Sequence, residues 1–188
     1  MYRFAFLILS LSLFGCGSDK SEAPPAAEVS MAQAAPGTSV DWNSHGNDWG
    51  EQRHSVLDQV NRDNVKDLGL DWSFDMYTRR GVEATPLVVD GIMYVSGSWS
   101  MVYALNAVDG TLKWFYDPKV DRTFLAKGCC DAVNRGVAYA NGKVIVGAYD
   151  GRLIALNVSD GSLAWEVQTT DREQSYTITG APRIAGDK

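Results

Sequence analysis

The stretch GIMYVSGSWSMVYALNAVDGTLKW, residues 91–114, returns as GKVIVGAYDGRLIALNVSDGSLAW at residues 142–165. The two stretches align without a gap at a spacing of 51 positions, counted from Gly91 to Gly142. Each contains Ala-Leu-Asn, then Asp-Gly after two further residues, then a Leu and a Trp. Self-similarity at such a period indicates a repeat architecture, in which each unit needs neighbours to bury its apolar face.

Each repeat has the pattern of a set of short antiparallel strands. The dipeptides Asp90-Gly91 and Asn141-Gly142 favour two-residue hairpins, because both central residues of a type I′ turn need positive φ. Asp-Gly recurs at 109–110 and at 160–161, where we expect the same kind of turn. The intervening runs are rich in β-branched and aromatic residues, and they predict strands over Ile92–Val95, Met101–Asn106, Leu112–Tyr116, Val144–Val146, Arg152–Asn157 and Leu163–Val167. Four short strands in about 50 residues favour a β-propeller blade over a β-solenoid, whose repeats are usually shorter.

The segments around the two repeats extend this all-β prediction. A short helix over Asn61–Leu68, ended by Gly69, precedes a predicted strand over Leu70–Phe74. A third unit begins at Thr179, in Thr-Gly-Ala-Pro-Arg-Ile. We therefore expect an N-terminal strand of the kind that completes the last blade of a propeller, about two blades and the start of a third. Because two blades cannot close a ring of about four to eight, we expect the N-terminal part of a longer protein or a broken reading frame.

The N-terminus has the pattern of a targeting segment. Its apolar run, 4–14, is too short to span a bilayer, which takes roughly 20 residues, but it suits a secretory signal. The run ends in Leu-Phe-Gly-Cys, which resembles the bacterial lipoprotein cleavage box and predicts a lipid on Cys16. An ordinary signal peptide with a chance cysteine is the alternative. We expect residues 1–16 to be a lipoprotein-type signal peptide.

The predicted export also bears on the rest of the chain. Residues 17–38 are small, polar and proline-containing, and they predict a flexible linker before a folded domain over 39–188. The expected location is the periplasm, with the protein anchored to a membrane by lipid. That compartment is oxidising, so disulfides persist there.

Composition excludes several classes of function. The 188 residues carry a formal net charge of −6 with a pI near 4.8, so a general electrostatic grip on nucleic acid is not expected. Hydrophobic residues make up 45% and charged residues 21%, which is ordinary for a globular protein. The sequence contains no dinucleotide-binding fingerprint, Walker A motif, HExxH motif or EF-hand loop.

The most unusual chemical feature is a pair of adjacent cysteines, Cys129 and Cys130, in KGCCDAVNRG. A bond between them would close only a small strained ring, because neighbouring Cα atoms lie about 3.8 Å apart and disulfides prefer about 4.4–6.8 Å. Such a ring closes no loop of chain and adds almost nothing to stability. A rigid, flat, polarizable disc at a binding site explains the pair better, and two buried free thiols are the alternative. A metal site is disfavoured, since no CxxC is present.

From about Asp41 to its end, the chain resembles the quinoprotein alcohol dehydrogenases, which are periplasmic enzymes of the methanol and ethanol dehydrogenase group. The resemblance rests on RRGVEATPLVVDG with the repeat that follows, on CCDAVNRG, and on YTITGAPR. It implies an eight-bladed propeller in the full-length protein. The adjacent cysteines with Asn-Arg-Gly downstream are the most specific of these motifs. The commoner form of the repeat has Asp at Asn106 and Asn157, a substitution that turns tolerate.

The resemblance also implies a cofactor, pyrroloquinoline quinone (PQQ), and roles for five residues. Cys129 and Cys130 would form the disulfide ring that stacks on one face of the quinone. Arg135 would bind an oxygen or carboxylate of PQQ, as suits a guanidinium fork. Thr179 would donate a hydroxyl hydrogen bond, and Glu83 would face a cofactor carboxylate. Trp99, Trp114 and Trp165 are expected to pack between blades instead of touching the cofactor.

The same resemblance implies the reaction and its partners. A primary alcohol would be oxidised to an aldehyde with PQQ and calcium, and a cytochrome c or similar protein would accept the electrons. The calcium ligands and the general base of the family fall beyond Lys188, as would a haem c domain. We therefore expect these 188 residues to be inactive alone. The alternatives are a non-catalytic propeller lipoprotein that serves as an assembly scaffold, and a PQQ sugar dehydrogenase, against which the cysteine pair counts.

Overall fold

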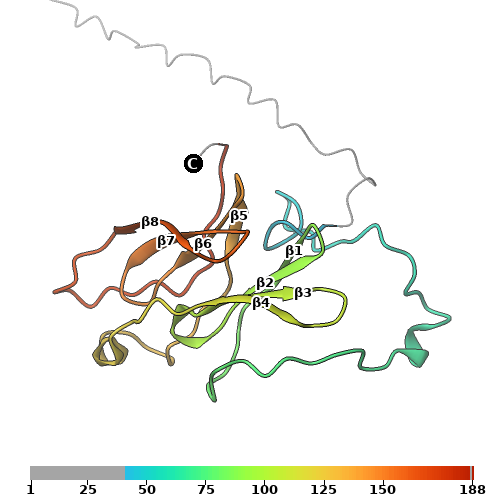
Figure 1. Cartoon of the computed structure of the whole chain (residues 1–188), viewed down its shortest axis with the longest axis horizontal. Coiled ribbons are helices and arrows are strands. Elements are labelled where there is room, and N and C mark those ends of the chain that lie inside the picture. Colours follow the sequence, from blue (N-terminus) through green and yellow to red (C-terminus); the bar gives the residue numbers. More distant parts are fainter. Residues whose placement is uncertain (1–40, 187) are drawn as a thin grey trace, which may run out of the picture. The chain divides into compact units, whose positions relative to one another are not determined.

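The computed structural model describes residues 41–186 and 188, and its regular structure is two four-stranded antiparallel sheets (Figure 1). The first sheet has the order β1-β2-β3-β4 and the second has the order β5-β6-β7-β8. The strands are β1 (Leu87–Val89), β2 (Ile92–Ser96), β3 (Val102–Asn106), β4 (Leu112–Tyr116), β5 (Ala138–Ala140), β6 (Lys143–Gly147), β7 (Arg152–Asn157) and β8 (Leu163–Gln168). All six predicted repeat strands are confirmed to within two residues at each end, and β1 and β5 supply the first strand of each blade.

Turn chemistry sets the register of both sheets in the same way. Asp90 and Gly91 have φ of 50° and 72°, and Asn141 and Gly142 have φ of 50° and 68°. These are the positive values that a two-residue type I′ hairpin requires, and they pair the flanking residues of β1 with β2 and of β5 with β6. The predicted hairpin turns are therefore present at both positions. The same turn type predicted at 109–110 and 160–161 is wrong, because only the glycine of each pair has positive φ.

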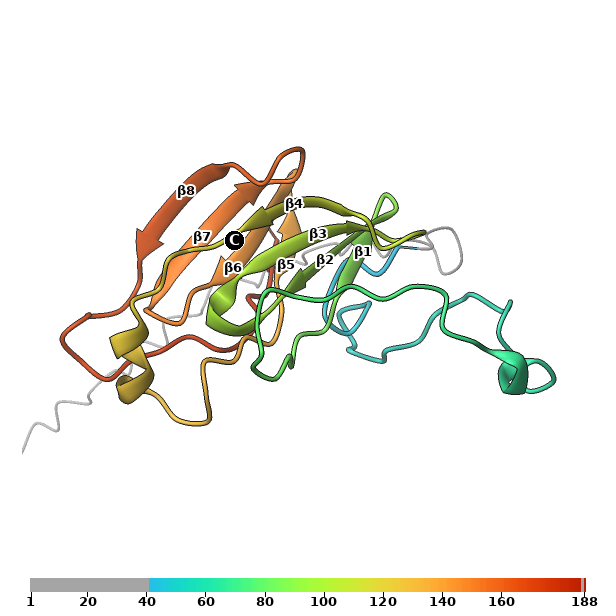
Figure 2. The same cartoon turned by 60° about the horizontal axis from the view of Figure 1, so that its bottom comes forward.

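The two sheets share one hydrophobic core. Residues of both blades belong to it, among them Leu87 and Val102 of the first and Val144 and Ile154 of the second. Figure 2 shows the two separate sheets as neighbours. The indole of Trp114 joins them, because its Nε1 donates a hydrogen bond of 2.8 Å to the carbonyl of Val158. This contact confirms that Trp114 packs between the blades.

Two predictions upstream of the sheets are wrong in detail. Instead of a helix over Asn61–Leu68, the structure has a single 3-10 turn, η1, at Val65–Asp67. None of its residues is buried, and no side chain caps its N-terminus, so nothing stabilises a longer helix. Residues 70–74 form no strand and pair with no strand in the part of the chain that the structure describes. Their side chains nevertheless alternate between exposed and half-buried from residue 71 to residue 74. Trp72 and Phe74 pack against a second hydrophobic cluster on the first sheet, which consists of Val95, Met101, Tyr103 and Leu105.

The connections hold structure that the sequence did not predict. The link between β2 and β3 forms a 3-10 turn, η2 (Ser98–Ser100), and the link between β4 and β5 forms η3 (Arg122–Lys127). Residues from Thr179 onward contain no strand among those described, so the third unit is not formed as a hairpin. No helix in the described ranges is long and apolar enough to cross a membrane. The predicted signal peptide, linker and Cys16 lie outside the described residues.

Candidate cofactor-binding site

The segments that lead into the two blades and into the predicted third unit lie side by side. Thr85 forms a parallel bridge with Gly136, and the backbone N–H of Thr85 donates to the carbonyl of Arg135 at 3.3 Å. The backbone N–H of Arg135 in turn donates to the carbonyl of Thr179 at 2.9 Å. Segments that are far apart in the sequence are thus held in register by backbone hydrogen bonds, and side chains from all three can meet.

Arg135 connects two of the other predicted site residues. Its Nη2 lies 3.2 Å from Oε2 of Glu83, and its Nη1 donates a 2.7 Å hydrogen bond to Oγ1 of Thr179. The side chains of Arg135 and Glu83 are 46% and 44% exposed, so solvent screens their attraction and the pair adds little to stability. The cluster therefore presents a guanidinium, a carboxylate and a hydroxyl to solvent together, which suits a binding role better than a structural one.

The predicted disulfide between Cys129 and Cys130 is present, with their Cα atoms 3.8 Å apart. Both residues are exposed. Cys130 and Asp131 have φ of 69° and 76°, so two successive residues with side chains occupy the left-handed region. Such a conformation persists only where the surroundings fix it, and it is found most often at binding and active sites.

Neighbouring segments fix the loop that carries the disulfide. The carbonyl of Ala132 accepts a 2.8 Å hydrogen bond from the backbone N–H of Trp99, and the carboxylate of Asp131 pairs with the guanidinium of Arg80. On the other side of the cysteines, a side chain at Gly128 would collide with the hydroxyl of Tyr149. The loop is therefore held after the disulfide by Trp99 and Arg80, and Tyr149 packs closely against it before the disulfide.

Tyr149 is the most deeply buried polar group near this loop. Its side chain is fully buried, and its hydroxyl has no hydrogen-bond partner among the described residues. Burial, followed by the nearby Asp131 carboxylate, raises the pKa of Tyr149 above its ordinary value. The hydroxyl therefore stays protonated, and it supports Gly128 by contact.

The amide of Asn134 is a site residue that the sequence analysis missed. It is 1% exposed, and its Oδ1 accepts hydrogen bonds from the hydroxyl of Ser96 at 2.6 Å and the N–H of Gly136 at 3.1 Å. Its Nδ2 donates to Oγ of Ser100 at 3.2 Å and to the carbonyl of Gly147 at 2.9 Å. Asn134 is thus saturated and ties both blades to the backbone on either side of Arg135. The available signal was its place in the Asn-Arg-Gly motif, of which the sequence analysis gave a role only to Arg135.

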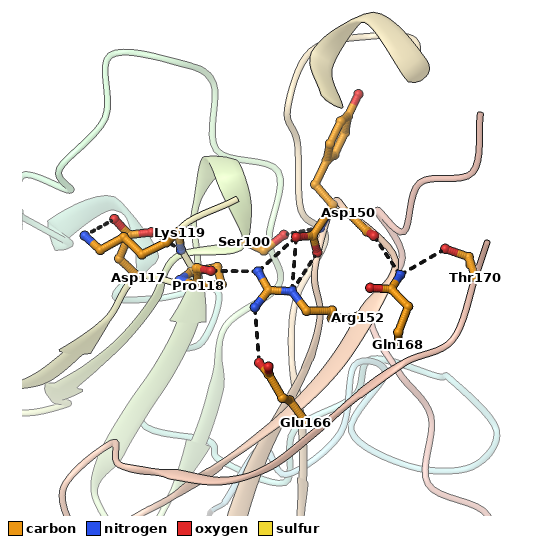
Figure 3. A network of polar contacts seen from close by, with 10 residues as sticks. Ser100, Asp117, Pro118, Lys119, Asp150, Arg152, Glu166, Gln168 and Thr170 are labelled. Carbon is orange, nitrogen blue, oxygen red and sulfur yellow. Dashed lines mark hydrogen bonds and ion pairs between the residues drawn. The ribbon is translucent and has the colours of Figure 1, made fainter. Parts of the chain in front are cut away.

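A second polar network fixes the beginning of the connection that leads to the disulfide (Figure 3). Nε of Arg152 donates to both carboxylate oxygens of Asp150 at 3.0 Å, and its Nη1 lies 3.1 Å from Oε2 of Glu166. Its Nη2 donates to the carbonyl of Pro118 at 2.6 Å. Burial alone would lower the pKa of Arg152, but the hydrogen bonds and charge of Asp150 outweigh it and raise the pKa. The guanidinium therefore stays charged and links the second blade to the segment that follows β4.

These features fit a flat anionic ligand. The exposed disulfide offers a small polarizable surface, while the exposed Arg135 guanidinium and the Thr179 hydroxyl offer donors to oxygens or carboxylates. Glu83 already pairs with Arg135. Because two carboxylates repel each other, Glu83 could lie next to a ligand carboxylate only if a donor such as the Arg135 guanidinium bonds to both. No group of three or more potential metal ligands occurs among the described residues.

Comparison with known proteins gives one consistent family. The profile of the PQQ glucose/ethanol/alcohol dehydrogenase β-propeller domain matches residues 42–166. The quinohemoprotein alcohol dehydrogenase of Comamonas testosteroni is 48% identical over 186 residues, which cover 94% of this chain and 26% of that protein. The 1-butanol dehydrogenase (cytochrome c) of Thauera butanivorans is 51% identical over 149 residues, covering 79% of this chain and 22% of that protein.

Solved structures agree with the sequence relatives. The crystal structure of the Comamonas testosteroni enzyme superimposes with a TM-score of 0.76 and 56% identity, over 78% of this chain and 22% of that one. A europium-containing methanol dehydrogenase gives a TM-score of 0.74 and 40% identity, over 78% and 26%. The chain spans about a quarter of the length of these relatives and carries part of their β-propeller. It belongs to the PQQ-dependent glucose/ethanol/alcohol dehydrogenase family.

Proposed function

We propose that this chain is the N-terminal portion of a periplasmic, PQQ- and calcium-dependent alcohol dehydrogenase that oxidises primary alcohols to aldehydes. The observation that carries the proposal is the contact of Arg135 with both Glu83 and Thr179, in a chain that also carries an exposed vicinal disulfide. The relatives named as alcohol dehydrogenases support the reaction class.

Each residue of the site has a part in holding the quinone. The Cys129–Cys130 disulfide would cover one face of it, and the guanidinium of Arg135 would bind an oxygen or carboxylate at its edge. The hydroxyl of Thr179 would donate a second hydrogen bond, while Glu83 would keep the Arg135 guanidinium oriented. When bound, PQQ supplies the two-electron acceptor for the alcohol.

The metal and the electron acceptor follow from the relatives. The sequence resemblance favours calcium, and one structural neighbour contains europium. Metal analysis of the complete protein should find calcium, and a lanthanide in its place would contradict this part of the proposal. The Thauera butanivorans relative is named for cytochrome c, and the Comamonas testosteroni relative is a quinohemoprotein. We therefore propose a cytochrome c or similar acceptor, with a haem c in the complete protein.

Location rests on the N-terminal sequence. We propose export to the periplasm and a lipid anchor on Cys16, supported by the apolar run 4–14 and the cleavage box that ends it. Globomycin, which blocks lipoprotein signal cleavage, should cause the precursor to accumulate. Normal processing in its presence would contradict the anchor.

The test of function uses the complete polypeptide that contains this chain, loaded with PQQ and calcium. The parent protein should bind PQQ and reduce an artificial electron acceptor with 1-butanol, while Arg135→Gln should bind PQQ at least about tenfold more weakly, because a charge-assisted donor is lost. Arg62→Gln, an exposed site far along the chain, is the matched control and should behave as the parent. The isolated 188 residues should show no turnover.

Unchanged PQQ affinity in Arg135→Gln would refute the site, and alcohol oxidation by the isolated 188 residues would refute the proposed inactivity. The assembly-scaffold alternative predicts a protein that does not bind PQQ at all. It also gives no reason for an exposed vicinal disulfide in a chain where a guanidinium, a carboxylate and a hydroxyl meet.

A further inference from the structure

A second concave site lies beside the disulfide loop, in a groove of about 630 Å³. The segment Tyr77–Arg80 forms one part of its lining, and Trp99 and Arg122 form another. None of the five residues proposed to hold the quinone lines this groove. The groove therefore needs an explanation of its own.

Trp99 is the fixed element of the groove. It is 7% exposed and has φ of 62°, which is rare for a bulky side chain and costs conformational energy. A hydrogen bond from its backbone N–H to Ala132 and an edge-on contact with the ring of Tyr149 hold it in place. Strained backbone of this kind is concentrated at ligand sites, so the position of this indole indicates a functional constraint.

Two guanidinium groups lie over this one indole. The Cζ atom of Arg122 is 4.1 Å from the ring centroid, and that of Arg80 is 5.3 Å from it. Cation–π contacts orient the two planar groups, so their N–H donors are presented at defined positions next to an aromatic surface.

The charges of the groove do not cancel. Its Asp117 is engaged by Lys119, whose Nζ lies 2.9 Å from Oδ2, and Arg80 is engaged by Asp131. Arg79 and Arg122 have no ion pair within 4.0 Å among the described residues, although the charge of Arg122 is one of the smaller causes that lower the pKa of Asp117. The chain as a whole has a formal net charge of −6, but this groove is positive. A concave surface lined by charges of one sign concentrates the electrostatic potential inside it, so the groove favours anions.

We propose that this groove binds a small organic anion, a carboxylate attached to a flat or apolar body. The guanidinium groups of Arg79 and Arg122 would hold the carboxylate, and Tyr77 and Leu125, which also line the groove, would contact the body. Acetate, which lacks the body, and phenol, which lacks the charge, should bind much more weakly than benzoate.

The experiment is calorimetric titration of the complete polypeptide with benzoate, acetate and phenol in turn, at low ionic strength. Benzoate should bind saturably in the millimolar range, and acetate and phenol should not. Arg122→Gln and Arg79→Gln should each weaken benzoate binding at least about tenfold, because each removes a charge-assisted donor from an exposed position. Arg122→Lys should recover part of the affinity. Arg62→Gln is the matched control, and circular dichroism verifies that each variant is folded.

Arg135→Gln separates this inference from the proposed function. It should leave benzoate binding intact while it weakens PQQ binding. If benzoate binding is lost in Arg135→Gln but kept in Arg122→Gln, benzoate occupies the quinone site and the inference is wrong. Absence of saturable benzoate binding, or affinity unchanged by both groove substitutions, would equally overturn it.

Discussion

Replacement of Asn134 by leucine, which has similar volume, should destabilise the fold by about 3 kcal/mol. The substitution leaves the N–H of Gly136 and the carbonyl of Gly147 buried without this partner. Each orphaned backbone group costs about 1–3 kcal/mol, which gives a range of about 2–6. The added apolar burial returns about 1–2 kcal/mol. Ser100 keeps its hydrogen bond from the N–H of Tyr149, but the buried hydroxyl of Ser96 loses its acceptor as well, which keeps the expected net loss near about 3 kcal/mol.

The assay is denaturant unfolding followed by tryptophan fluorescence, combined with amide hydrogen exchange at Gly136. Asn134→Leu should lower the unfolding free energy and accelerate exchange at Gly136 by at least about tenfold. Asn157→Ala is the matched control, because that amide makes one exposed hydrogen bond of 3.0 Å to Ser162. Its loss should cost no more than about 1 kcal/mol. Equal stability of the two variants would refute the view that Asn134 is a structural hub.

Three further predictions rest on single contacts. Arg152→Leu leaves the Asp150 carboxylate buried and unpaired, so we expect a loss of about 3–5 kcal/mol in denaturant unfolding, and a loss below 1 would contradict a buried ion pair. Gly128→Ala should loosen the disulfide loop, measured as faster reduction by a mild thiol, and Tyr149→Phe in the same chain should restore the parent rate in part, because it removes the colliding hydroxyl but leaves the ring carbon of Tyr149 and Cγ2 of Thr177 close to the added methyl group; no slowing of reduction in the double variant would exclude the contact. Burial, with smaller contributions from Tyr139 and Asp90, raises the pKa of Tyr94 to about 12 from an unfolded value near 10. The stability that Tyr94 contributes is full below about pH 10 and is lost as pH rises through about 12. The unfolding free energy of Tyr94→Phe should therefore fall less steeply with pH between about 10 and 12 than that of the parent, and parallel plots of unfolding free energy against pH would refute the assignment.

Local rules account for most of what the sequence predicted correctly. The strands follow from β-branched runs, and their register follows from Asp90-Gly91 and Asn141-Gly142, because a turn that needs positive φ fixes its neighbours without reference to the rest of the chain. The helix predicted over 61–68 failed for the complementary reason. Its pattern satisfied local propensity, but no residue of η1 is buried, and tertiary burial supplies most helical stability.

The site divides along the same line. The motif containing Cys129 and Cys130 is contiguous, so it can be recognised in the sequence alone. The hydrogen bonds of Asn134 reach Ser96 and Gly147 in two different sheets, and no local pattern encodes them. The groove around Trp99 depends likewise on loops far apart in the sequence, whose packing becomes visible only in the fold.

Trp72 packs on the first blade although the strand predicted for its segment does not form. Its Nε1 donates a 3.2 Å hydrogen bond to the carbonyl of Ala107, and its ring lies against Gly110. Trp114 makes the corresponding contacts one unit later, at 2.8 Å to the carbonyl of Val158 and against Gly161.

Residues 70–74 thus place an indole on the first blade in the way that β4 places one on the second. The stretch does so without pairing to any described strand, because ring packing over a glycine and one side-chain hydrogen bond do not require a ladder. The same contacts explain burial at equivalent positions of the repeat. Trp114 is 8% exposed with a glycine under its ring, and Trp165, for which the described residues supply no such glycine contact, is 39% exposed. The repeated tryptophan therefore encodes a contact between units, and its burial depends on what lies against it.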